Sequence, residues 1–499
     1  MLTGSTHREN LQALASFRGA ATLVELRADF LSRAEQSGVA RFAAVCPLPA
    51  ILTVRRARDG GWFTGSENER MALLRRGLSG AFAYVDLEND LPPTAVAVPG
   101  RTQIIRSYHH VTATPHDLTM QAAACCRHPA EIPKLAVRPR SVADLEQVVA
   151  LGQRIRRPHI VIATGDYGIA TRLLAQRLGS MLTFSSPPTR QGAAGHMTPT
   201  ELTHSYGVPR VSETTLVNAI VGCPVAHSRS PRIHNAGYRS SRMDAIYVPL
   251  HGERLAPLLR CAEQLGVSGV SVTVPHKEAA AALAVAGDDS VANTGACNTL
   301  VRAGDGWRGY NTDVEGFLMP LRSRRLMGSG SPAAPVSAAL VVGTGGAARA
   351  AVHALTTAGV RVLVAGRRLQ RAQLLAAEFG AEAVELQAAD LAERAAPYLR
   401  LVVQASSAGM TPNAGVDPIA SIPLGGDETV YDMVYAPDET ALLARARAAG
   451  CATIGGMEML LAQAFAQYRL FTGAPYPLAA LRELGLLEVG QRLLEAGSK

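Results

Sequence analysis

The chain has few of the features that mark disulfide-rich, nucleic-acid-binding or membrane proteins. Its 499 residues include seven cysteines, an odd number with no Cys-x-x-Cys pair, which favours reduced thiols over a disulfide framework or a zinc site. Aromatic residues make up only 5%, which argues against a base-stacking surface. No uninterrupted apolar run reaches the ~20 residues of a membrane helix, and residues 1–10 lack the apolar core of a signal peptide. We expect a soluble, cytoplasmic protein without a metal that binds neither nucleic acid nor membrane.

The composition leaves ample material for large cores. Hydrophobic residues make up 47% and charged residues 18%, and the length suggests roughly three domains at about 150 residues each. The net charge of +8 comes without a basic run, so arginines of an enzyme that binds anionic ligands explain it.

Short apolar runs alternate with helical patterns over the first half of the chain, which predicts a parallel sheet covered by helices. Polar residues stand at the C-terminal ends of these strands, where a (β/α)₈-type barrel builds its active site. Only seven strands are recognisable, because the first helical stretch, Arg8–Gly19, begins almost at the first residue. The first strand of the barrel is therefore missing from the pattern, and we expect either an open barrel or a true start upstream of the given one. The seven predicted strands are Thr22–Leu26, Ala50–Val54, Phe82–Leu87, Gln103–Ser107, Ile132–Val137, Ile160–Thr164 and Met181–Ser185.

A glycine-rich turn follows the apolar strand predicted at Ala338–Val342. The spacing Gly343-x-Gly345-x-x-Ala348 fits the fingerprint of a strand-to-helix turn that binds a dinucleotide. An NAD site would place an acidic residue about twenty residues on, but this chain has arginines there, which suit the 2′-phosphate of NADP. We predict NADP(H) as the cofactor. The expected cofactor residues in this unit are Gly343, Gly345, Gly346, Ala347, Gly366, Arg367, Arg368 and Arg371.

A cluster of polar residues suited to a polyhydroxylated acid precedes this turn. It contains Thr273, Lys277, Asn298 and Asp313. Oxidation of a secondary alcohol requires loss of the hydroxyl proton as hydride leaves carbon, and a lysine oriented by a carboxylate can exchange that proton. Together with the dinucleotide unit, the cluster predicts a hydride-transfer enzyme that acts on a small ring alcohol.

Residues 217–480 resemble the shikimate dehydrogenase family. The match rests on the cluster above, the glycine-rich turn and the segment Gly222-x-Pro224-x-x-His227-Ser228-x-Ser230-Pro231-x-x-His234-Asn235. The resemblance implies that Ser228 and Ser230 hold the substrate carboxylate and that Lys277 transfers the proton. It further implies that Thr273, Asn298, Asp313 and Gln463 bind ring hydroxyls, that Met433 and Gly456 line the nicotinamide end and that Tyr435 lies close to the substrate. Where the family often has Asn-Arg-Thr, this chain has Gly366-Arg367-Arg368, which can shift the cofactor preference.

The first half resembles type I 3-dehydroquinate dehydratase over about residues 8–200. The resemblance implies that Lys134 forms a Schiff base with the substrate ketone and that His109 shuttles protons, with Glu88 orienting the imidazole. This chain departs from the family at three places. In the closing loop, Gly192 and His196 replace a serine and a glutamine; Asp59 replaces a glutamate; and the first strand is missing. The matching pieces are Glu25–Asp29, Thr53–Arg55 before Gly60-Gly61, Asp86–Glu88, Ser107–His109, Pro133-Lys134 and Arg172, of which Glu25, Arg27, Arg55 and Arg172 are expected to bind the substrate.

We therefore predict an α/β protein made of a barrel and a two-domain dehydrogenase with a Rossmann-like NADP domain. It would dehydrate 3-dehydroquinate to 3-dehydroshikimate and reduce that product to shikimate with NADPH. Two alternatives stay open: a dehydrogenase with an inactive, degenerate barrel, and a non-catalytic quinate or shikimate sensor. The expected domains are residues 1–205 for the barrel, 215–325 with 456–490 for the substrate domain and 335–455 for the NADP domain.

Overall fold

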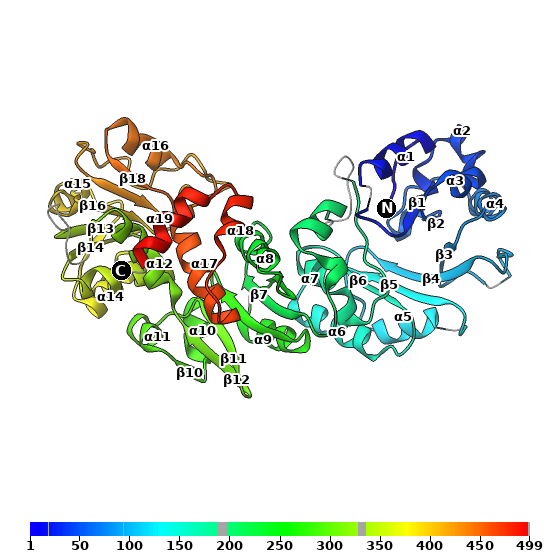
Figure 1. The fold of residues 1–499 in the computed structure, drawn as a ribbon, viewed down its shortest axis with the longest axis horizontal. Helices are drawn as coiled ribbons and strands as arrows, with labels where there is room; N and C mark the ends of the chain where they lie inside the picture. The colour runs from blue at the N-terminus through cyan, green and yellow to red at the C-terminus, as the bar shows by residue number, and fades with distance from the viewer. Residues whose placement is uncertain are drawn as a thin grey trace. The chain divides into compact units, whose positions relative to one another are not determined.

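The computed structural model describes residues 1–17, 19–92, 94–126, 128–187, 195, 197–327 and 336–497 (Figure 1). The chain packs into two compact units, the first formed by residues 1–217, 224–227 and 244–267 and the second by the remainder. Among the described helices, none combines the length and apolar character needed to cross a membrane.

The first unit is built on a six-stranded parallel sheet in the order β1-β2-β3-β4-β5-β6. Six of the seven predicted strands are confirmed, with bounds shifted by at most three residues. The seventh, expected at Met181–Ser185, is reduced to a single bridge between His159 and Ser180. The strands are β1 (Val24–Arg27), β2 (Ala50–Thr53), β3 (Tyr84–Glu88), β4 (Gln103–His110), β5 (Ile132–Val137) and β6 (Ile160–Ala163), and the helices between them include α3 (Val39–Val45), α4 (Glu67–Leu78), α5 (Leu118–Cys125) and α6 (Val142–Arg154).

The place of the first barrel strand is taken by one residue pair. Leu2 bridges Leu26 of β1 in parallel, with main-chain hydrogen bonds from Leu2 N to Glu25 O (2.8 Å) and from Arg27 N to Leu2 O (3.1 Å). The amino group of Met1 donates to the carbonyl oxygen of Ser185 at 2.7 Å. The residues beside β1 and beside β6 therefore meet, and the sheet closes into a ring.

Alternation along the strands separates the inside of this ring from its outer layer. Apolar side chains that point inward form a small cluster with Phe184, while the alternate residues, such as Leu52 and Val85, pack with the helices. Because successive strand residues face opposite sides, polar residues two apart on one strand, such as Asp86 and Glu88, lie on the same face.

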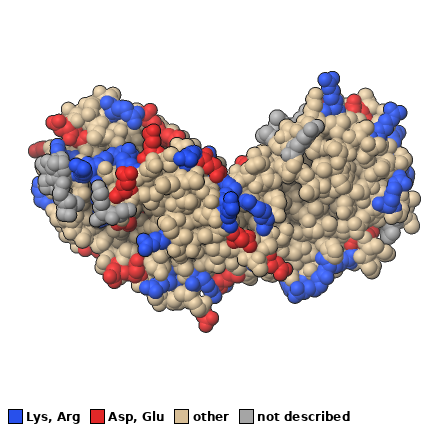
Figure 2. Space-filling view, in the orientation of Figure 1, with Lys and Arg blue, Asp and Glu red and all other residues tan. Residues whose placement is uncertain are grey.

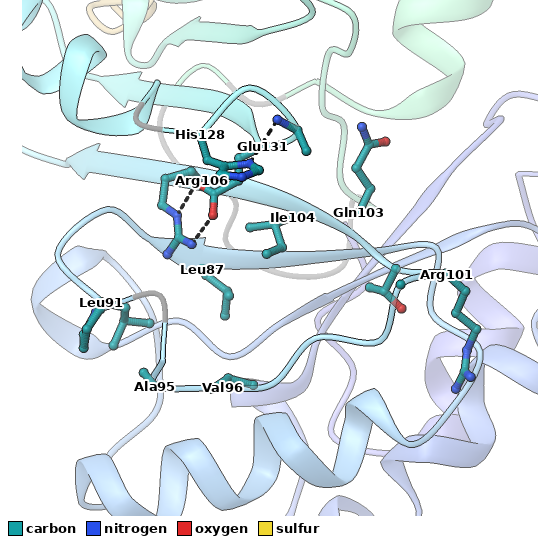
Figure 3. A pocket seen from close by; sticks show the side chains of 14 residues that line it. Leu87, Leu91, Ala95, Val96, Arg101, Gln103, Ile104, Arg106, His128 and Glu131 are labelled. Carbon is teal, nitrogen blue, oxygen red and sulfur yellow. Dashed lines mark hydrogen bonds and ion pairs between the residues drawn. The ribbon is translucent and has the colours of Figure 1, made fainter.

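The connection from β3 to β4 contains no helix among its described residues. A cavity of about 530 Å³ opens there, on the outer face of the two strands, with apolar walls from Leu87 and Ile104 (Figure 3). The guanidinium of Arg106 lies at its edge and forms a bidentate pair with Glu131 at 2.5 and 3.0 Å. This cavity is separate from the polar interior of the ring, since Arg106 and Ser107 face opposite sides of β4.

Two further six-stranded sheets follow. The second has the order β10-β12-β11-β9-β7-β8 and the third β15-β14-β13-β16-β17-β18. Every strand pairing in the described part of the third sheet is parallel, and its strand order is that of the doubly wound dinucleotide-binding fold. The strands are β7 (Leu216–Gly222), β8 (Ala245–His251), β9 (Val267–Val272), β10 (Ala286–Gly287), β11 (Thr299–Ala303), β12 (Gly306–Tyr310), β13 (Ala338–Val342), β14 (Arg361–Gly366), β15 (Glu382–Glu385), β16 (Leu401–Gln404), β17 (Thr429–Asp432) and β18 (Ala452–Ile454).

The third sheet carries hydrophobic side chains on both faces, as a buried parallel sheet requires. Ala339 and Val341 of β13 point into one core together with Leu355, while Leu340 and Val342 point into the core on the opposite face. Charged side chains stay outside these cores, and on the face seen in Figure 2 the second unit carries both signs interspersed.

Candidate active sites

Lys134 of β5 projects into the polar interior of the first sheet. Its ammonium group donates to Asp86 Oδ2 at 2.8 Å and lies 3.9 Å from Glu25 Oε1. The same nitrogen stands 4.5 Å from the ring centroid of Phe184, close enough for a cation–π interaction. The side chains of both Lys134 and Asp86 are buried, so an amine is held beside carboxylates with little solvent around it.

Asp86 interacts with three polar side chains of this interior, Lys134 among them. It accepts a hydrogen bond from Ser107 Oγ at 2.5 Å and pairs with Arg55 at 2.8 Å. Burial alone would raise the pKa of Asp86, but the positive charges of Arg55 and Lys134 outweigh burial and lower it. Sequence reasoning missed Asp86 and Ser107 as site residues, although each lies two residues before a strand-end residue that was singled out, and the strand period of two would have placed it on the same face.

His109 of β4 is buried in the same interior. Its pKa is lowered well below the ordinary value by burial and then by the nearby charges of Arg55 and Lys134, so the imidazole is neutral near pH 7. Glu88, expected to orient the imidazole, instead pairs with Arg70 at 2.9 Å. The described residues give no hydrogen bond between Glu88 and His109.

Three buried polar atoms in this interior lack a hydrogen-bond partner among the described residues: Glu25 Oε2, His109 Nδ1 and Arg172 Nε. Buried polar atoms are normally paired, so unpaired ones at one place mark where a polar ligand would bind.

The three arginines predicted to bind substrate differ in their partners. Arg27 forms a bidentate pair with Asp29 at 2.6 and 2.9 Å, and Arg55 is held by Asp86. Arg172, on α7 (Ile169–Leu173), has no carboxylate partner among the described residues; its Nη1 donates to the carbonyl oxygen of Phe184 at 3.2 Å. Burial lowers the pKa of Arg172 to about 10. A charged guanidinium with unused donors is therefore available for an anion.

Two of the sequence departures concern individual side chains. Asp59 forms an ion pair with Arg56 at 2.6 Å. Gly192 and His196, which replace a serine and a glutamine of the closing loop, lie outside the described residues.

The second polar site is centred on Lys277 and Asp313 in the second unit. Nζ of Lys277, the first residue of α10 (Lys277–Leu283), donates to Asp313 Oδ2 at 2.5 Å. The other carboxylate oxygen accepts from Asn298 Nδ2 at 2.8 Å, and Asn311 Oδ1 accepts from the main-chain N–H of Asp313 at 3.2 Å. The predicted lysine–carboxylate pair is thus brought together, with Asn298 fixing the carboxylate.

Helix α17 (Gly456–Thr472) is bonded to the second sheet beside this site. Gln467, which sequence reasoning did not single out, donates to Thr299 Oγ1 at 3.0 Å and accepts from Ser271 Oγ at 2.7 Å. Gln463, one turn earlier, donates to its own helix at Leu460 O and packs against Gly316. Gln467 therefore fixes the helix to the sheet. The side-chain amide of Gln463 uses its N–H group within the helix, so its side-chain oxygen can accept a hydrogen bond from a ligand.

The serines predicted to hold a carboxylate lie at the start of α8 (Ser230–Ser240). The main-chain N–H of Ser230 donates to Ser228 Oγ at 3.2 Å. Ser228 also shares a side-chain hydrogen bond with Tyr435, whose pKa is nevertheless raised because burial outweighs that bond. Thr273 packs its methyl group against Gly222 at the end of β7. Tyr435 and the two serines are therefore gathered at one end of the site.

The glycine-rich turn stands where β13 ends and α13 (Gly346–Thr357) begins. Gly343 has φ +125° and lies against the backbone of Ala405, a conformation and an approach that exclude a side chain. The space in front of Gly345 is open to 4 Å. This is the point in the strand order where ligands bind in such sheets, and the N-terminus of α13 offers N–H groups for phosphates.

The end of β14 carries the expected cluster of arginines. Arg367, Arg368 and Arg371 are exposed, and no ion pair to a described residue occupies any of them. At the other side of the turn, Gly456 lies against the carbonyl of Met433. Positive charge at the second strand and small residues near the turn fit a phosphorylated dinucleotide.

Comparison with known proteins places both halves. Residues 1–213 match the family model of type I 3-dehydroquinase, residues 220–300 that of the shikimate dehydrogenase substrate binding domain and residues 331–411 that of shikimate/quinate 5-dehydrogenase. The bifunctional 3-dehydroquinate dehydratase/shikimate dehydrogenase of Arabidopsis thaliana, a chloroplastic protein, is 31% identical over 476 residues, which cover 92% of this chain and 78% of that protein.

Relatives of the second half alone are closer in sequence. The NADP(+) shikimate dehydrogenase of Salinibacter ruber is 39% identical over 278 residues, covering 54% of this chain and 96% of that protein. The solved shikimate 5-dehydrogenase of Thermus thermophilus, in complex with NADP(H) and shikimate, is 32% identical with a TM-score of 0.46, covering 56% of this chain and 100% of that one. From the three family matches and the relative that spans both halves, the chain belongs to the family of bifunctional 3-dehydroquinate dehydratase/shikimate dehydrogenases.

Proposed function

We propose that the chain catalyses two consecutive reactions of the shikimate pathway, the dehydration of 3-dehydroquinate in the barrel and the NADPH-dependent reduction of 3-dehydroshikimate to shikimate in the second half. The observation that carries this proposal is the presence of two separate lysine–carboxylate pairs, Lys134 with Asp86 at 2.8 Å and Lys277 with Asp313 at 2.5 Å. One lies beside a buried, neutral histidine, and the other lies beside a dinucleotide-binding turn. We assign residues 1–205 to the barrel, 215–325 with 456–490 to the substrate domain and 335–455 to the NADP domain.

In the dehydratase, Lys134 attacks the substrate ketone as a free amine, and water leaves to give an iminium. The iminium withdraws electrons from the neighbouring C–H bond, so neutral His109 can remove that proton. The electron pair then expels the β-hydroxyl group, which takes the proton from His109 and leaves as water. Hydrolysis of the iminium releases 3-dehydroshikimate and restores Lys134. The proton that the ammonium group of Lys134 loses leaves on the ketone oxygen as part of the water released when the iminium forms. Asp86, which stays ionised, orients the amine and stabilises the positive iminium.

The unpaired polar atoms give the substrate its contacts. Arg172 takes the carboxylate of 3-dehydroquinate, because its guanidinium is buried and has no acidic partner among the described residues. Glu25 has one free oxygen for a ring hydroxyl. Arg27 and Arg55 are already paired with aspartates and therefore act as donors at the margin of the substrate.

In the dehydrogenase, NADPH supplies the hydride when it is bound. Lys277 gives a proton to the carbonyl oxygen of 3-dehydroshikimate as that oxygen becomes a hydroxyl, and Asp313 orients the lysine and an adjacent hydroxyl. Thr273, Asn298 and Gln463 bind the remaining hydroxyls. Ser228 and Ser230 hold the carboxylate, with Tyr435 beside them.

The cofactor residues follow from the turn and the arginines. Gly343, Gly345, Gly346 and Ala347 surround the open space at the start of α13, where the pyrophosphate would meet the helix N-terminus. Gly366 with Arg367, Arg368 and Arg371 suits the 2′-phosphate, while Met433 and Gly456 line the nicotinamide end. No step requires a metal. We propose that the ligands are small molecules and neither nucleic acid nor membrane. We also propose that the enzyme works in the cytoplasm.

Borohydride reduction tests the assignment of Lys134. A Schiff base with 3-dehydroshikimate would be fixed as a secondary amine, so the purified chain treated with both reagents should gain the mass of the reduced adduct on the peptide that contains Lys134. Lys134→Arg keeps the positive charge beside Asp86 and should gain nothing. Adduct on another lysine, or equal adduct in Lys134→Arg, would refute the assignment. A wild-type chain that reduces 3-dehydroshikimate but forms no adduct would instead favour the dehydrogenase with an inactive barrel.

A further inference from the structure

Asp432, the last residue of β17, is a buried carboxylate that the mechanism above does not use. It is 1% exposed and stands at the C-terminal edge of the third sheet. Its Oδ1 accepts the main-chain N–H of Val434 at 3.0 Å, and its Oδ2 accepts the hydroxyl of Thr440 at 2.6 Å. Thr440 in turn caps α16 (Ala441–Ala448) through Leu443 N at 3.2 Å.

These two hydrogen bonds tie together both ends of residues 433–440. The segment carries Tyr435, which bonds to Ser228, and Asp438, which pairs with Arg229 at 2.6 Å. Its first residue, Met433, is fixed by a main-chain bond to Gln404 O at 2.9 Å. The segment therefore reaches from the NADP-binding sheet to the serines of the carboxylate end, and Asp432 is the group that fixes its course.

The environment of Asp432 indicates that it is not there for stability. Burial raises the pKa of Asp432 to about 6; the hydrogen bonds from Thr440 and Val434 act against this shift, and the negative charge of Asp417 adds to it. Asp417 is itself paired with Arg445 at 2.6 Å. A raised folded-state pKa means that the ionised form of Asp432 is less favourable in the folded protein than in the unfolded chain. The resulting loss of folding stability is full above about pH 6 and absent below about pH 4.

We propose that Asp432 is a positioning residue of the dehydrogenase, whose carboxylate fixes residues 433–440 and so holds Tyr435 against Ser228 at the carboxylate end of the substrate site. This role rests on the proposed reduction of 3-dehydroshikimate. Asp432 therefore affects the binding of substrate and not the transfer of the proton or hydride, because Lys277 and Asp313 are held by other groups.

The test is the steady-state kinetics of full-length variants with shikimate and NADP⁺. Asp432→Ala should raise the KM for shikimate about tenfold, the equivalent of one hydrogen bond to a charged group, while kcat changes by less than about threefold. Asp432→Asn keeps an oxygen for Val434 N and a donor for Thr440 Oγ1, so it should restore KM to within about threefold of wild type and should not lower the melting temperature at about pH 8. Thr440→Val, which removes one of the two bonds, should fall between Asp432→Ala and wild type.

Asp427→Asn, an exposed acid of the same domain, is the matched control and should change nothing. The melting temperature and the near-ultraviolet circular dichroism of each variant report whether its second unit is folded, because the dehydratase site lies in the other unit. An unchanged KM in folded Asp432→Ala or in Thr440→Val would overturn the role, as would a loss confined to kcat. A wild-type chain without shikimate oxidation would instead refute the proposed function itself.

Discussion

Gly346 lies directly against the side chain of Lys277: a Cβ atom on this glycine would stand 2.8 Å from Cδ and 3.1 Å from Cβ of the lysine. The first residue of the dinucleotide-binding helix thus touches the proposed proton donor. The turn that receives the cofactor is therefore in direct contact with the residue that exchanges the proton. The position of the ammonium group depends on the position of this helix.

Because Gly346 touches Lys277 and Gly345 does not, substitutions at these two glycines should have different effects. Gly346→Ala should displace the stem of Lys277 and lower the dehydrogenase kcat by about tenfold or more, since a shift of about 1 Å in a reacting group is costly. Gly345→Ala puts its methyl group into open space, so it should spare Lys277 and raise the KM for NADPH instead. Steady-state kinetics with both substrates varied distinguish these outcomes, and the same loss of kcat in both variants would contradict the assignment.

Arg172 offers a test of the barrel. Arg172→Gln removes the one predicted substrate arginine that has no acidic partner among the described residues, so the KM for 3-dehydroquinate should rise about tenfold to a hundredfold, as expected for a lost charge-assisted bond. Dehydrogenase activity should not change. Arg157→Gln, whose guanidinium binds main-chain carbonyls at the surface, is the control, and equal effects in the two variants would argue against a substrate contact.

The arginines after β14 predict the cofactor preference. Removing the charge of Arg367 and Arg368 together, as alanines, should reduce the ratio of kcat/KM for NADPH to that for NADH by about tenfold or more, because the 2′-phosphate loses its ion pairs. Arg400→Ala, at another position of the same domain, should leave the ratio as it is. A ratio that stays the same in the double variant would show that other residues recognise the phosphate.

The two halves should respond differently to acid. The pKa of His109 is far below its ordinary value, so the imidazole stays neutral and the dehydratase kcat/KM should show no loss with a midpoint near 6.5. Asp432 has its pKa raised to about 6, so it gains a proton as the pH falls through about 6 and its hold on residues 433–440 weakens. A neutral side chain at this position costs at most about threefold in KM, as in Asp432→Asn. The KM for shikimate should therefore rise by up to about threefold over that range in wild type and stay level in Asp432→Asn. A parallel rise in both chains would assign the titration to another group.

Local sequence patterns were enough for six of the seven strands predicted in the first half, for the glycine-rich turn and for the positions of the strand-end polar residues. Alternation, strand length and turn chemistry are properties of short segments. They did not reveal Asp86 as the partner of Lys134, since that contact joins β3 to β5 and Glu88 is a second carboxylate on the same face of β3. Nor did they reveal that Arg27 and Arg55 are already paired while Arg172 is not, which depends on the packing of the whole ring. The bridge at Leu2 was missed because one residue pair carries no periodicity.

The most direct test of two active sites on one chain is to add 3-dehydroquinate without nicotinamide, follow the ultraviolet absorbance of the conjugated enone, and then add NADPH. The wild-type chain should produce the enone and then consume NADPH. Lys134→Ala should produce no enone yet still oxidise NADPH when 3-dehydroshikimate is supplied, and Lys277→Ala should produce the enone and leave NADPH untouched. If Lys134→Ala forms the enone at the wild-type rate, or if each substitution abolishes both activities in a folded chain, the assignment of two independent lysine sites is contradicted.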